Sequence, residues 1–379
     1  MSHHSTPALA LVAALALTGV RVPALAVSPQ PGGVLPANPA QASSPEARTG
    51  TRVEDPLLSI RQAEAGGVIL PDAASAQEAA DDTPTTIIVQ LEEGAAGGSA
   101  TATRDEAKAR IASAVQAAVP GAQVTTVRDY TNALDGFAIE APGSALSAIQ
   151  KVQGVKAAFI EGVHKPLETS ADGAGTPVLK NASSLAMTRA AEAAQKGDRQ
   201  VIEVIDSGLQ TDHDAFAGSM DGVDVRLSQA DVQAFASKLP HGSSGTYVNS
   251  KIPFAYDYAD NDADVVPHSE KDLSHGTHVT AIAAANAADL QGTAPHAQII
   301  VAKVAADKDG SIPDSTVLAA LDDALVIKPD VINLSLGDDA GMSSDAGSVF
   351  AGVYEALTNA GITVNAASGN AFSNAYGNN

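Results

Sequence analysis

The chain has 379 residues, of which 45% are apolar, and this is sufficient for two or three folded units with cores of their own. Its 44 acidic and 22 basic side chains leave a net charge of −22, which disfavours binding to nucleic acid or to an anionic membrane surface. The sequence contains no cysteine, which excludes disulfides, thiol nucleophiles and cysteine-ligated metal centres.

Residues 1–26 are predicted to be a secretory signal. The stretch from Ala8 to Val20 is apolar but too short to span a bilayer, and a small-x-small pattern follows it at residues 24–26. Histidines stand where such signals usually carry Lys or Arg, so a buried helix of a cytosolic domain is the alternative. We expect export of the protein and no membrane span.

Residues 27–84 are rich in Ala, Pro, Gly and Ser without a hydrophobic period, which is typical of a spacer. In residues 85–166, short apolar runs alternate with helical patterns in the order βαββαβ. Such a unit places its helices on one face of a small antiparallel sheet. The strands are expected at residues 86–91, 123–128, 136–140 and 155–161, and the helices at residues 104–119 and 144–152.

A linker and an N-terminal arm are expected over residues 167–199, before strands and helices begin to alternate regularly over residues 200–379. Apolar strands that alternate with amphipathic helices predict a parallel, doubly wound α/β sheet, incomplete in this chain. Ligands of such sheets bind at the carboxyl ends of the strands. The strands are expected at residues 200–205, 254–258, 298–304, 331–336 and 362–367, and the helices at residues 276–288, 315–327 and 343–360.

Three polar motifs end predicted strands or open a predicted helix. Asp206 ends the first parallel strand, His275 opens a helix and Asn370 follows the last strand. A carboxylate can orient an imidazole, an imidazole can transfer protons, and an amide can donate a hydrogen bond to an oxyanion. Each motif alone has a structural alternative: a turn residue for Asp206 and Asn370, and a helix cap, or a metal ligand together with His278, for His275.

Taken in order, these motifs resemble those of the subtilisin-like serine peptidases. Residues 204–208 (VIDSG) match the family's aspartate motif, residues 275–279 (HGTHV) its histidine motif and residues 368–370 (SGN) its oxyanion motif. Residues 292–297 (GTAPHA) resemble its Gly-x-Ala-Pro turn, and residues 333–337 (NLSLG) resemble the strand that lines its primary specificity pocket. The wide spacing between the first two motifs is closer to the lactocepin and C5a-peptidase branch.

The resemblance implies a subtilisin-like catalytic domain that hydrolyses peptide bonds by acyl transfer. Asp206 would orient His275, which would transfer the proton of a serine nucleophile, and Asn370 would donate to the oxyanion. The branch also implies a secreted protein, with attachment to the cell wall left open.

The resemblance also implies the partners of the chain. Ser335, Leu336 and Gly337 would bind a protein or peptide substrate as an added strand. Residues 85–166 would form a ferredoxin-like propeptide that acts as an intramolecular inhibitor and chaperone.

The nucleophile of this family lies in a Gly-Thr-Ser motif after the oxyanion Asn, and the nine residues after Asn370 contain no such motif. The loop at residues 242–245 does not qualify, since it precedes His275 and opens no helix. We interpret the sequence as a secreted endopeptidase zymogen without its C-terminal part and predict this polypeptide to be inactive. The alternative is a non-catalytic inhibitor or binding module that acts through residues 85–166.

The predicted chemistry needs no cofactor and no catalytic metal. A structural calcium ion is left open without assigned ligands, because Asp257, Asp260, Asp262 and Asp264 supply carboxylate oxygens in one acidic run. The run lacks the glycine of an EF-hand loop, so a solvated acidic loop is the alternative interpretation.

Overall fold

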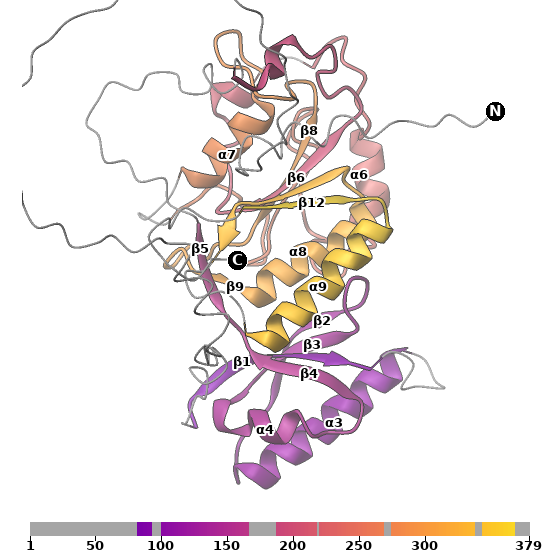
Figure 1. Cartoon of the computed structure of the whole chain (residues 1–379), viewed down its shortest axis with the longest axis vertical. Coiled ribbons are helices and arrows are strands. Elements are labelled where there is room, and N and C mark those ends of the chain that lie inside the picture. The colour runs from indigo at the N-terminus through magenta and orange to yellow at the C-terminus, as the bar shows by residue number, and fades with distance from the viewer. Residues whose placement is uncertain are drawn as a thin grey trace, which may run out of the picture.

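The computed structural model describes residues 82–92, 100–166, 187–217, 220–268, 274–337 and 343–367. The predicted signal and nearly all of the predicted spacer lie outside these residues. Among the described residues, no helix is long and apolar enough to cross a membrane. The described chain forms an N-terminal unit (residues 82–166) and a main unit (residues 187–367), shown in Figure 1.

The main unit is built on five parallel strands in the order β12-β10-β6-β8-β7, so the predicted parallel sheet is confirmed. Strand residues alternate between two cores, with Val204 on the side of α7 and Ile205 on the side of α8 and α9. Helices therefore cover both faces, as a doubly wound sheet requires. The strands are β6 (Val201–Asp206), β7 (Phe254–Asp257), β8 (Gln298–Lys303), β10 (Val331–Leu334) and β12 (Thr363–Ala366), and the helices are α7 (His275–Ala284), α8 (Asp314–Ile327) and α9 (Ser344–Asn359).

The N-terminal unit is an antiparallel sheet in the order β2-β3-β1-β4, with α3 and α4 on one face. The predicted βαββαβ order is confirmed, although the second helix is short and begins with a 3-10 turn at Gly143–Ala145. The elements are β1 (Pro84–Leu91), α3 (Ala100–Ala118), β2 (Thr125–Tyr130), β3 (Gly136–Pro142), α4 (Leu146–Ile149) and β4 (Val155–Ile160).

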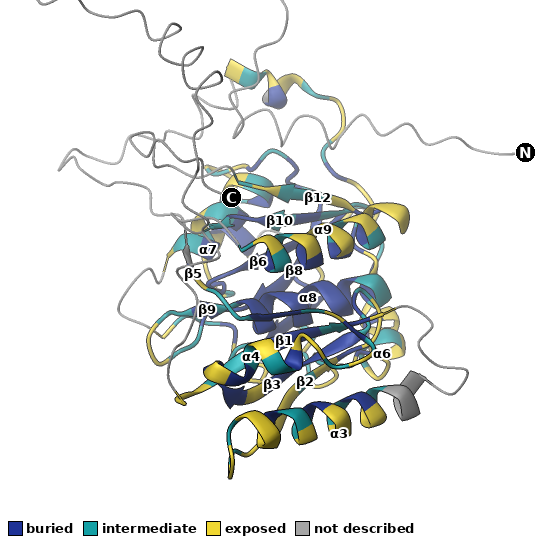
Figure 2. Ribbon diagram, turned by 60° about the horizontal axis from the view of Figure 1, so that its bottom comes forward, coloured by how far each residue is buried: buried dark blue, intermediate teal, exposed yellow. Residues whose placement is uncertain are grey.

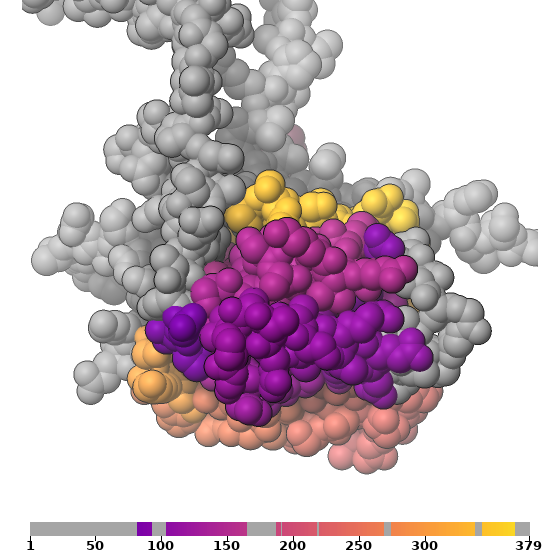
Figure 3. Space-filling view, turned by 90° about the horizontal axis from the view of Figure 1, so that it is seen from below, coloured from indigo at the N-terminus to yellow at the C-terminus, as the bar shows by residue number. Residues whose placement is uncertain are grey.

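Both faces of this N-terminal sheet are apolar, and each belongs to a different core. Ile87 and Val89 of β1 pack with Ile111 and Val115 of α3 in a core that belongs to the N-terminal unit. Ile88 lies between them in the strand and points to the opposite face, where it joins the core of the main unit. The sheet thus packs against α8 and α9, and Figure 3 shows the N-terminal unit, indigo to magenta, over this side of the main unit.

Helix α8 lies between the two units and is buried along nearly its whole length (Figure 2). Its buried residues include three carboxylates, Asp314, Asp322 and Asp323. Buried charges need partners, and those of Asp314 and Asp322 include residues of the N-terminal unit, so these two side chains help to join the units.

A third sheet of three short strands also joins the units. β5 (Val163–Pro166), which ends the N-terminal unit, lies between β9 (Ile312–Pro313) and β11 (Leu336–Gly337) of the main unit and is antiparallel to both. The N-terminal unit therefore adds a strand to the main unit beside the carboxyl edge of the parallel sheet.

Two details differ from the sequence prediction. A short helix, α6 (Gln229–Ala236), was not predicted, although Ser228 and Asp231 form a capping box at its start. In α9, Val349, Val353 and Leu357 are buried, but Ala360, the last residue of the predicted helix, lies just after the observed helix and is exposed.

Candidate active site

Asp206 and His275 meet at the carboxyl edge of the parallel sheet. Asp206 is the last residue of β6 and His275 is the first residue of α7, so chain segments 69 residues apart place them side by side. The imidazole Nδ1 lies 2.7 Å from the carboxylate Oδ1, and the two side chains are 10% and 1% exposed. Because a carboxylate accepts, Nδ1 carries the proton, and in the neutral ring Nε2 is left as the acceptor that a general base needs.

Glycine at two positions allows β6 and α7 to approach closely. A Cβ on Gly276 would lie 2.2 Å from the carbonyl oxygen of Gly208 and 3.1 Å from Oδ1 of Asp206. Gly208 itself has a φ of +112°, and a Cβ there would lie 2.4 Å from the carbonyl oxygen of Val265. These contacts explain why glycine follows both the Asp-Ser pair and the histidine in the sequence.

The backbone of Gly276 also donates a hydrogen bond to Oγ of Ser207, at 3.1 Å. A second link comes from Thr277, whose Oγ1 accepts the backbone N–H of Gln210 at 3.0 Å. The aspartate motif and the histidine motif are therefore joined by several contacts besides the Asp206–His275 hydrogen bond.

The predicted substrate-binding strand is paired with a strand of the same chain. Leu336 of β11 lies opposite Pro166 and Gly337 lies opposite Lys165, both in β5. Ser335 is buried, and its Oγ accepts a hydrogen bond from Nδ2 of Asn333 at 2.9 Å. The edge of β11 thus binds an extended peptide by strand addition, and in this structure that peptide is the end of the N-terminal unit.

Comparison with known proteins identifies the family to which this part of the chain belongs. Residues 197–378 match the model of the subtilase family, Peptidase S8. This part of the chain is a subtilase domain. The family predicted from the motifs is therefore confirmed, and so is the α/β fold class that the family implies.

Curated relatives of the chain are peptidases of much greater length. The PI-type proteinase of Lactococcus lactis subsp. cremoris is 31% identical over 243 residues, which are 60% of this chain and 12% of that protein. The C5a peptidase of Streptococcus pyogenes serotype M3 is 29% identical over 157 residues, which are 39% of this chain and 13% of that protein. The chain thus spans about an eighth of the length of these relatives.

Among solved structures, the epidermin leader peptide processing serine protease of Staphylococcus aureus aligns with a TM-score of 0.44 at 13% identity. The alignment covers 74% of this chain and 59% of that structure.

Asn370, predicted to stabilise the oxyanion, lies outside the described residues. His278, the alternative metal ligand, is exposed on α7. The described residues contain two groups of three or more side chains that could ligate a metal, and neither includes His275 or His278. In the subtilase domain, Nδ1 of His275 therefore makes a hydrogen bond with Asp206, and His275 does not form a metal site with His278 among the described residues.

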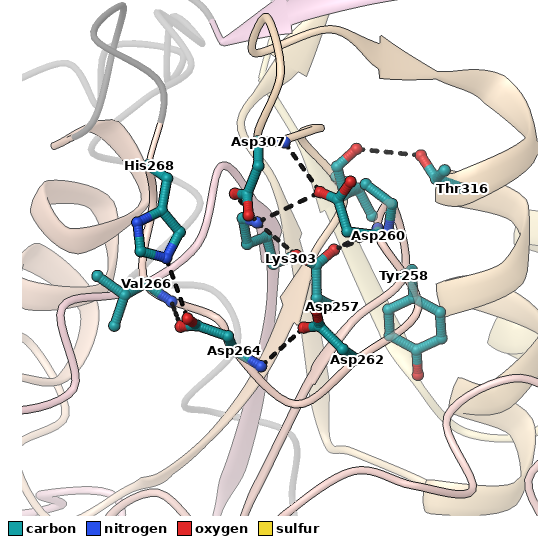
Figure 4. Close-up of polar contacts among 12 residues, drawn as sticks. Asp257, Tyr258, Asp260, Asp262, Asp264, Val266, His268, Lys303, Asp307 and Thr316 are labelled. Atoms are coloured by element: carbon teal, nitrogen blue, oxygen red, sulfur yellow. Dashed lines mark hydrogen bonds and ion pairs between the residues drawn. The ribbon is translucent and has the colours of Figure 1, made fainter.

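The acidic run for which the sequence left a calcium ion open is divided in the structure (Figure 4). Asp257 and Asp260 gather with Asp307, whereas Asp262 and Asp264 accept backbone N–H groups of the local turn at 2.9 and 3.1 Å. The four residues of the run therefore do not converge on one point.

A lysine ammonium already lies between the carboxylates that do converge. Nζ of Lys303 binds Asp257 and Asp307 and lies 3.7 Å from Asp260. Burial lowers the pKa of Lys303, but the hydrogen bonds to Asp257 and Asp307 outweigh it and the pKa is raised. These residues do not fit a calcium ion, because the cation between them belongs to the protein.

Lys303 is also adjacent to Asp206, the candidate active-site aspartate. In the sheet it lies opposite Asp206, and the backbone N–H of the next residue, Val304, donates to the carbonyl oxygen of Asp206 at 3.0 Å. The ion pairs in Figure 4 therefore hold the strand that supports Asp206 in the subtilase domain.

The buried carboxylates of α8 were not predicted from the sequence. Asp322 accepts the backbone N–H groups of Thr131, Asn132 and Ala133 in the N-terminal unit, at 3.2, 2.7 and 2.7 Å to Oδ1. Asp323 accepts backbone N–H groups of residues 241 and 242 in the subtilase domain. An acidic pair in a predicted helix is usually exposed, so the sequence contained no local signal for these buried contacts.

Proposed function

We propose that the chain is the precursor of a secreted serine endopeptidase. The observation that supports this most directly is the Asp206–His275 hydrogen bond of 2.7 Å at the carboxyl edge of a subtilase domain, beside a strand edge that binds an extended peptide. Secretion is supported by the signal pattern of residues 1–26.

The proposed chemistry is acyl transfer through a serine nucleophile. Nε2 of His275 would take the serine proton during attack on the peptide carbonyl and return it to the leaving amine. Asp206 would keep the ring in the required tautomer and stabilise the imidazolium, and Asn370 would donate to the tetrahedral oxyanion. The serine would belong to the Gly-Thr-Ser motif that the family resemblance implies after the oxyanion Asn, and residues 371–379 do not contain this motif.

The N-terminal unit is proposed to be the inhibitory propeptide. β5 is antiparallel to β11, and its later residues lie toward the start of β11, where the chain leaves β10 at the carboxyl edge. The chain in β5 therefore runs toward the edge that holds Asp206 and His275, as a substrate would. A strand held in this place excludes other peptides until it is cut and released.

This function is tested with the full-length gene product. After processing, we expect it to hydrolyse casein and to be labelled and inhibited by a serine-directed fluorophosphonate. The unprocessed precursor should do both far more slowly, because β5 occupies the substrate edge. A full-length product that is free of the N-terminal unit but cleaves no protein and takes no label would refute the proposal, and it would favour the non-catalytic inhibitor.

A further inference from the structure

The carboxylate of Asp314 is buried at the start of α8 and is 2% exposed. Oδ1 lies 2.6 Å from Nε2 of His164, and Oδ2 accepts the backbone N–H of Gly162 at 2.7 Å. Among the described residues, these are the hydrogen bonds that its side chain makes, and the donors lie just before β5 and within it. Since the carboxylate can only accept, Nε2 of His164 carries the proton.

The pairing of β5 explains why the imidazole reaches this carboxylate. His164 lies opposite Ile312 of β9, and Asp314 follows two residues later in the same segment. The backbone on both sides is fixed further, because the N–H of Asp314 donates to the carbonyl oxygen of Gly162 at 3.0 Å. Any peptide that takes the place of β5 in this register directs the side chain at the position of His164 toward Asp314.

We infer that Asp314 is a specificity-determining residue, which selects substrates with histidine or another cationic side chain at the position taken by His164. The inference rests on the proposed function, in which β5 occupies the place of the substrate. It names the chemical class of that substrate: an extended peptide with an imidazole or a cation at the residue paired with Ile312.

The discrimination follows from the burial of the carboxylate. The backbone N–H that reaches Oδ2 is present in almost any peptide, so it does not distinguish substrates. The bond to Oδ1 depends on the side chain, and a leucine there would leave a buried carboxylate oxygen without its donor. A glutamate would add a second negative charge at close range, which is worse than the missing donor.

The test uses the processed full-length protein and peptides that copy residues 158–175, with His, Gln, Leu or Glu at the position of His164. We expect kcat/KM to be about ten- to a hundredfold higher for His than for Leu, because this ratio corresponds to the free energy of a hydrogen bond to a charged group. Gln, a neutral donor, should lie between them, and Glu should be the poorest.

The variant Asp314→Asn should reduce the His-to-Leu ratio to below about threefold and relieve the rejection of Glu. The matched control is Asp309→Asn, an exposed carboxylate whose side chain bonds the backbone N–H of Ser311, and it should leave the ratio unchanged. The ratio compares two substrates on one enzyme, so a general loss of folding does not alter it.

Casein hydrolysis by the same preparation separates the possible failures. If casein is cleaved but the peptides show no preference for His, or the preference persists in Asp314→Asn, the inference is wrong and the proposed function stands. If casein is not cleaved either, the proposed function fails and the inference fails with it.

Discussion

Four buried carboxylates of the main unit form two groups that differ in where their partners come from. Asp206 and Asp257, at the ends of β6 and β7, bind His275 and Lys303 of the same unit. Asp314 and Asp322, in α8, bind donors from the N-terminal unit. When the N-terminal unit is removed, the first group keeps its partners, Asp314 loses both of its donors, and Asp322 keeps only His241, whose Nε2 lies 3.3 Å from Oδ2. Contacts within the main unit and contacts between the two units are therefore made by the same residue type in different packing environments.

The largest expected effect is on the Asp206–His275 pair. In the full-length protein, His275→Ala should lower peptide hydrolysis on the order of 10⁶-fold, the size reported for loss of the base in a subtilisin. Asp206→Asn should lower it about 10⁴-fold, because an amide that donates to Nδ1 selects the wrong imidazole tautomer. For both variants, the loss of activity is measured as kcat on a peptide substrate and as the rate at which the precursor processes itself.

The control for this prediction is the exposed pair of His296 and Asp198, whose closest atoms are 3.2 Å apart. Asp198→Asn should leave turnover unchanged, because this pair lies in solvent. Normal self-processing of His275→Ala would mean that another protease cuts the precursor or that His275 has been assigned the wrong role.

The second largest effect is expected at Lys303. Lys303→Met should lower the free energy of unfolding by about 3–5 kcal/mol, since it leaves the buried carboxylate of Asp257 without its cation. Burial already raises the pKa of Asp257 even with Lys303 in place. Urea unfolding measures the change, and Lys308→Met, at an exposed neighbour, is the control. Equal losses in the two variants would contradict the prediction.

A smaller effect concerns Asp323, whose partners lie within its own unit. Burial raises its pKa from 3.8 to about 6. Between these values the folded protein binds more protons than the unfolded chain, so the free energy of unfolding falls as the pH rises through 6, by about 3 kcal/mol in total. Asp323→Asn should remove this part of the decline.

Urea unfolding between pH 4 and pH 7 measures the slope for the wild type and for Asp323→Asn. The control is Asp309→Asn, because Asp309 is exposed and its pKa is lowered by hydrogen bonds to Ser311. If the wild-type and Asp323→Asn curves run parallel over this range, Asp323 does not titrate as described.

The smallest effect is expected where Asp322 holds the N-terminal unit. Asp322→Asn should speed hydrogen exchange of the amides of residues 131–133 in the precursor by roughly ten- to a hundredfold, because an amide is a weaker acceptor than a carboxylate. Mass spectrometry of the precursor measures this exchange. Asp345→Asn is the control, since Asp345 accepts one hydrogen bond from Gln150 at 3.3 Å at the surface.

If the amides of residues 131–133 exchange at the same rate in the two variants, Asp322 does not stabilise this segment. The distinction between the two groups of carboxylates then fails at Asp322.

The sequence alone determined the family, the βαββαβ order and the parallel sheet, because periodicity and motif spacing are local properties of the chain. It also indicated that Asp206 and His275 would meet, since both stand where strands and helices of such a sheet come together. Only the tertiary structure decided which carboxylates of α8 are buried, and which of the acidic residues after β7 surround Lys303.

The pair of His164 and Asp314 shows the reason. These residues are 150 positions apart, and their hydrogen bond exists because β5 enters between β9 and β11 in one register. A shift of one residue would turn the imidazole to the other side of the strand. No local pattern encodes that register, because it depends on how the surfaces of the two units fit together.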